Sequence, residues 1–95
     1  MSTKEAYEKK IQAKLDEWNA EIDKLKAKAD SAEADAQLEY YQKIEELRSM
    51  RENAANKLSE LRAAGEDAWA DLKAGIDGAR DSLDKALKSA TSRFK

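Results

Sequence analysis

The sequence contains no cysteine, histidine, proline or valine, and these absences exclude several kinds of site. Without cysteine the chain has no disulfide, no thiolate nucleophile and no zinc–thiolate site. Without histidine it lacks the commonest general base and the commonest transition-metal ligand, which also excludes the Glu-x-x-His pairs of di-iron bundles. We therefore expect no enzymatic activity, no metal and no cofactor.

Glycine and long apolar runs are scarce as well. The three glycines, Gly65, Gly75 and Gly78, do not form a phosphate-binding loop. The chain has no runs of β-branched residues and no hairpin turn signals, so we do not expect a sheet. No apolar run approaches the ~18 residues of a membrane-spanning helix, and the first ten residues lack the apolar segment of a signal peptide. The expected location is the cytoplasm.

Alanine and balanced charge dominate what is present. Apolar residues make up 41% of the chain, and 18 of them are alanine. Charged residues make up 40%, with 18 basic and 20 acidic side chains. This composition is typical of coiled coils and long helices, because alanine is the strongest helix former. Each third of the chain holds similar numbers of bases and acids, so no segment predicts a nucleic-acid interface.

An apolar stripe with helical spacing runs along most of the chain. In the segment 61–94, Leu61, Leu72, Leu83 and Phe94 are eleven residues apart, which is three helical turns, so they share one face. Steps of three and four residues extend this face towards the N-terminus. The predicted oligomer interface consists of Ile11, Leu15, Trp18, Ile22, Leu25, Tyr40, Ile44, Leu47, Leu58, Leu61, Trp69, Leu72, Ile76, Leu83, Leu87 and Phe94.

Helix boundaries are less clearly marked than the stripe. The segment 2–5 reads as a capping box, with Ser2 as the N-cap and Glu5 three residues later. Two later segments could interrupt the helix: 30–33 resembles a new N-cap, and Gly65 could end a helix before the acids that follow it. The stripe keeps its phase through both segments. We therefore predict that the helix continues through Ser31 and through Gly65, with a helical hairpin turning near Gly65 as the alternative.

This stripe predicts association. A continuous helix of ~90 residues would be ~135 Å long and could not bury its own stripe. Either the chain folds back as a hairpin or a three-helix bundle, or it pairs with copies of itself. We predict an all-α fold with one coiled-coil domain over residues 1–95, in which long amphipathic helices form a homo-oligomeric bundle. The expected function is that of a non-enzymatic structural or interaction protein, which associates with itself or with a helical client protein.

Acidic clusters in the sequence do not predict a catalytic or calcium site. Neighbouring acids such as Glu45 and Glu46 point about 100° apart on a helix, so they cannot face each other across a cleft. The segment 30–41 superficially resembles a calcium-binding loop, but Asp35 stands where the loop requires glycine, and Tyr41 stands where it requires glutamate. The expected role of these acids is a solvated helix face.

Most of the chain resembles a known family. The resemblance rests on the segment LRAAGEDAWADLKAGIDGARDSLDKAL, on the Ser-Arg-Phe-Lys tail, and on the upstream segments EELR and KLSEL. They are similar to small coiled-coil proteins of cyanobacteria and other bacteria that are linked to stress responses. The resemblance covers most of the chain. It implies a cytosolic, oligomeric and non-enzymatic protein with a role under stress, and it brings no catalytic residues.

Binding to a membrane surface is the alternative function. The eleven-residue period is also similar to that of apolipoproteins and late-embryogenesis-abundant proteins. Apolar residues such as Trp69, Leu72 and Ile76 could lie in a lipid interface. However, the last third of the chain holds six acids beside six bases, which weakens its attraction to anionic lipid.

Overall fold

The first helix begins where the capping box predicts. In the computed structural model, which describes residues 2–94, helix α1 spans Thr3–Asp30. The Ser2 hydroxyl accepts a hydrogen bond from the Glu5 amide at 3.2 Å, so the serine half of the predicted box is confirmed. Met1 and Lys95, the ends of the predicted domain and of the Ser-Arg-Phe-Lys tail, lie outside the described residues.

Two turns divide the described chain into three helices. Helix α2 spans Ala34–Ala63 and helix α3 spans Trp69–Arg93. The prediction of a continuous helix through Ser31 and Gly65 is therefore wrong at both positions. The all-α fold is confirmed, and the turn at Gly65 matches the alternative prediction. The physical reason is burial: folding back at both turns lets one chain cover its own stripe, which a single straight helix cannot do.

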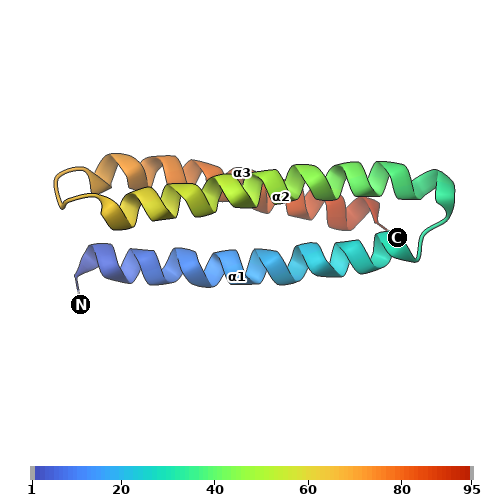
Figure 1. Cartoon of the computed structure of the whole chain (residues 1–95), viewed down its shortest axis with the longest axis horizontal. Helices are drawn as coiled ribbons and strands as arrows, with labels where there is room; N and C mark the ends of the chain where they lie inside the picture. The colour runs from blue at the N-terminus through green and yellow to red at the C-terminus, as the bar shows by residue number, and fades with distance from the viewer. Residues whose placement is uncertain (1, 95) are drawn as a thin grey trace.

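The three helices lie side by side in a bundle (Figure 1), which measures 50 × 19 × 18 Å along its principal axes. Helix α2 runs antiparallel to α1 and α3, so α1 and α3 are parallel to each other. Helix α2 packs extensively on both neighbours, whereas the interface between α1 and α3 is the least extensive of the three. At one end of the bundle, the Lys4 ammonium group donates to the Ala64 carbonyl at 2.7 Å and links α1 to the second turn.

One apolar core runs along the bundle axis. Among residues 2–94 no polar or charged residue is buried. The buried core residues are Tyr7, Ile11, Leu15, Trp18, Ile22, Leu25, Ala29, Ile44, Leu47, Ala54, Leu58, Leu61, Ile76, Leu83, Leu87, Ala90 and Phe94. All three helices contribute to this core. After the two turns, the apolar stripe of each helix faces the stripes of the other two, so all three are buried.

Candidate functional site

The structure places the predicted interface residues inside one chain. Thirteen of these sixteen residues are buried in the core, and Tyr40, Trp69 and Leu72 are half-buried against it. The chain's own helices therefore cover this stripe. Sequence reasoning missed Tyr7 and Ala90 as core residues, although each continues the helical spacing, four residues before Ile11 and three after Leu87.

A surface groove runs between α1 and α3, where helix packing is least extensive. We call it the α1–α3 groove, and its cavity has a volume of about 700 Å³. It is lined from α1 by Lys14, Glu21, Lys24, Leu25 and Lys28, and from α3 by Asp84, Lys85, Leu87, Lys88, Thr91 and Ser92. Five lysines against two acids give the groove a basic character, although the whole chain has a net charge of −2.

Helical spacing explains this arrangement of charge over an apolar floor. Leu25 and Leu87 are core residues whose exposed fraction is only 3% each. Lys24 and Lys28 are four residues apart on α1, and Lys85 and Lys88 are three apart on α3, so each pair follows one edge of the groove. Lysine stems can cover the floor while their ammonium groups stay in water. The groove therefore has an apolar floor and two basic edges.

Trp18 and Asp84 bridge the two helices at the groove. The buried indole of Trp18 donates from Nε1 to Asp84 Oδ1 at 3.0 Å. This bond gives the buried indole N–H its partner and fixes the position of the carboxylate. Asp84 does not form the ion pair with Lys88 that helical spacing favours.

Most of the groove lysines have no ion-pair partner within residues 2–94. Lys14 lies 3.5 Å from Glu17, but Lys24, Lys28, Lys85 and Lys88 form no ion pair in this part of the chain. Their ammonium groups can therefore pair with the acids of an incoming partner without breaking an existing contact.

A second hollow lies between α1 and α3 around Tyr7 and Asp77, and its volume is about 420 Å³. The Tyr7 hydroxyl donates to Asp77 Oδ1 at 2.5 Å, and the Lys73 ammonium group donates to Asp77 Oδ2 at 3.0 Å. That ammonium group also lies 5.2 Å from the centre of the Tyr7 ring. The three side chains satisfy one another, so they form a clamp between the helices.

The protonation states in this clamp are fixed by its hydrogen bonds. Burial raises the pKa of Tyr7 above its ordinary value, and the hydrogen bond to Asp77 raises it further. The hydrogen bond from Tyr7 lowers the pKa of Asp77, and the bond from Lys73 acts in the same direction. At neutral pH the phenol is therefore neutral and the carboxylate is charged. Both shifts move titration away from neutral pH, which is the opposite of what a general acid or base requires.

Residues 2–94 contain neither a metal-binding cluster nor a helix that could span a membrane. This part of the chain contains no group of three or more acidic, histidine or cysteine side chains that could hold a metal ion. None of its helices is both long and apolar enough to cross a membrane. No protein-family model matches the chain, and neither a curated protein nor a solved structure matches it.

Proposed function

We propose that this protein is a non-enzymatic interaction protein that works by helix-to-helix association. In this proposal the α1–α3 groove accepts an acidic amphipathic helix of a client protein as a fourth helix of the bundle. The observation that supports it is the pair of basic edges beside an apolar floor. The resemblance to stress-linked coiled-coil proteins supports a cytoplasmic role under stress.

The groove matches a helix in length as well as in charge. Its lining residues on α1 extend from Lys14 to Lys28, which corresponds to ~21 Å, or about four helical turns. An apolar stripe on the client would rest on Leu25 and Leu87, and acids beside that stripe would meet the lysines. This is the arrangement by which coiled coils select partners through charges flanking an apolar seam.

The test uses two designed 18-residue helical peptides with the same apolar stripe, flanked by glutamates in one and by lysines in the other. Fluorescence of Trp18 reports binding in a Trp69→Phe background, because the Trp18 indole lies beside the groove at Asp84. We expect saturable 1:1 binding of the acidic peptide, weakened by salt, and no binding of the basic one. Equal binding of both peptides would contradict the proposal.

A matched pair of variants locates the binding site. The double variant Lys85→Glu/Lys88→Glu reverses two charges at the groove, and we expect it to weaken binding of the acidic peptide at least tenfold. The control Lys9→Glu/Lys57→Glu makes the same change in net charge at two lysines that lie outside the groove. Like Lys85 and Lys88, they form no ion pair within residues 2–94, so this variant should bind like the wild-type protein. If the two variants lose affinity equally, the peptide recognises net charge and not the groove.

Binding to an anionic membrane surface is the second candidate function. The groove lysines favour it, because each lysine near an anionic surface contributes about 1 kcal/mol. The apolar residues of α3 that would enter lipid, such as Ile76 and Leu83, are buried, so the bundle would have to open. Co-sedimentation with phosphatidylserine vesicles, together with a change in helicity, would support this candidate. Vesicles that leave both signals unchanged would remove it.

A further inference from the structure

The turn between α1 and α2 contains nothing that prevents it from becoming helical. It consists of residues 31–33, without proline or glycine, and no described residue has a positive φ. Ser31 already has helical angles, φ −92° and ψ −5°. Glu33 is extended, with ψ 152°, and rotating this angle to about −42° is part of what would continue the helix. The turn is thus short and built from residues that tolerate a helix.

The core residues on either side of this turn share one helical phase. Ala29, Ala32, Ala36 and Tyr40 follow one another in steps of three, four and four residues. Ala29 is buried and the other three are half-buried. If the turn straightened, the core faces of α1 and α2 would form one continuous stripe. The combined helix could not cover that stripe alone, so it would require a partner with the same core.

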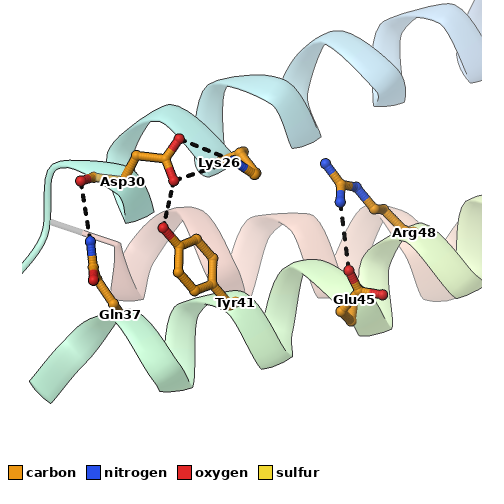
Figure 2. Close-up of polar contacts among 6 residues, drawn as sticks. All are labelled: Lys26, Asp30, Gln37, Tyr41, Glu45 and Arg48. Atoms are coloured by element: carbon orange, nitrogen blue, oxygen red, sulfur yellow. Dashed lines mark hydrogen bonds and ion pairs between the residues drawn. The ribbon is translucent and has the colours of Figure 1, made fainter. Parts of the chain in front are cut away.

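We call the turn closed when it folds α2 back on α1, as it does here. Exposed contacts around Asp30 hold it in this form (Figure 2). The Tyr41 hydroxyl donates to Asp30 Oδ1 at 2.5 Å, and Lys26 donates to Oδ2 at 3.1 Å. The Gln37 amide donates to the Asp30 carbonyl at 3.2 Å. Asp30 is also an acid at the C-terminal end of α1, where the helix dipole disfavours it, and α2 has no side-chain cap at Glu33. The helix ends at this turn are therefore weakly stabilised.

We propose that two copies of the chain exchange α1 by straightening residues 31–33. In the resulting dimer α1 and α2 form one helix, and each α1 occupies in the other copy the place it occupies in its own. The partner is a second copy because only α1 has the side chains that fit this place, including Trp18 opposite Asp84 and Tyr7 opposite Asp77. The exchange uses the core, so it is separate from the proposed client binding in the groove.

The first measurement is the mass and length of the refolded protein. The protein is unfolded in urea, refolded at high and at low concentration, and examined by light scattering and small-angle X-ray scattering. We expect the high-concentration sample to contain a dimer of twice 10.7 kDa. Its continuous helix of residues 3–63 would be ~90 Å long, compared with 50 Å for the single bundle. A monomer under all refolding conditions would overturn the proposal.

Proline at position 34 distinguishes exchange from association through an outer surface. Ala34 is the first residue of α2, where proline is favoured, and the extended Glu33 before it suits a proline. Within a continuous helix the same proline breaks the backbone ladder. We expect Ala34→Pro to fold as a bundle with unchanged helicity and to dimerise at least a hundredfold more weakly. Ala34→Ser is the control and should dimerise like the wild-type protein.

A second variant acts in the opposite direction. Tyr41→Phe removes only the hydroxyl that holds Asp30 in the closed turn. In a continuous helix these residues would be ~16 Å apart, so the bond exists only in the closed form. We expect about a fivefold increase in the dimerisation constant. A dimer that is unaffected by both Ala34→Pro and Tyr41→Phe would overturn the exchange.

Discussion

At the scale of single residues, Tyr7 and Trp18 fasten α1 to α3. Both aromatic side chains are buried, and each directs its one polar atom to an aspartate on α3, Tyr7 to Asp77 and Trp18 to Asp84. Buried polar atoms with a defined partner specify one alignment of two elements, because any shift leaves them unsatisfied. The two bonds therefore define how far α3 is displaced along α1.

The clamp at Asp77 predicts a pH dependence of stability. Because the folded state lowers the pKa of Asp77 below its ordinary value of 3.8, the unfolded state takes up its proton first. Its contribution is fully present above about pH 5 and is lost as the pH falls through the lowered folded pKa. Asp77→Asn should destabilise the protein at pH 7 by up to about 1 kcal/mol, and the difference should shrink below pH 4.

Urea unfolding at pH 7, 5 and 3 measures this difference. Asp81→Asn is the matched control, because the Asp81 side chain lines the same hollow but has no hydrogen bond or ion pair within residues 2–94. Its stability should follow that of the wild-type protein at each pH. A difference between Asp77→Asn and wild type that stays constant from pH 7 to pH 3 would contradict the assigned role.

At the scale of elements, the sequence predicts where helices form and which face is buried, but not where the helices end. The buried face of each helix can be read from the sequence, because apolar residues that share a helix face recur every three or four positions. The turns at Ser31 and Gly65 depend on the gain from packing three helices together, and no residue at either turn requires a non-helical backbone. Even Gly65 has no positive φ, so the break there does not depend on glycine's special freedom.

Within α3, Gly78 weakens the helix without serving a packing contact. A Cβ atom added at this position would meet nothing within 4 Å, so close packing does not explain the glycine. Gly78→Ala should stabilise the protein by about 1 kcal/mol in urea unfolding, because glycine is the poorest helix former after proline. Gly78→Ser should give about half of this gain. A loss of stability in both variants would show that another surface approaches α3 at Gly78.

At the scale of the whole molecule, lysines from two segments that are each balanced in charge gather along the α1–α3 groove. Counting bases and acids along the chain gives balanced thirds, so the basic α1–α3 groove cannot be recognised in that way. Its lysines come from two helices that are about sixty residues apart in sequence. Only the double turn, which makes α1 and α3 parallel neighbours, brings them together (Figure 1). With the helix ends known, a helical projection would place the lysines of α1 and α3 beside the apolar face of each helix, and this would have indicated the groove.

The single shared core predicts that the bundle unfolds as one unit. Every helix contributes buried residues to this core. If one helix separates, core residues of the other two become exposed to water, so the three helices should unfold together. In a Trp69→Phe background, Trp18 fluorescence should report the same urea midpoint as far-ultraviolet circular dichroism. Leu83→Ala should lower the free energy of unfolding by about 2–5 kcal/mol and shift both midpoints equally. Leu38→Ala, at a side chain that is 68% exposed, should change the free energy of unfolding by less than about 0.5 kcal/mol. A fluorescence midpoint below the dichroism midpoint would mean that α1 separates before α2 and α3 unfold.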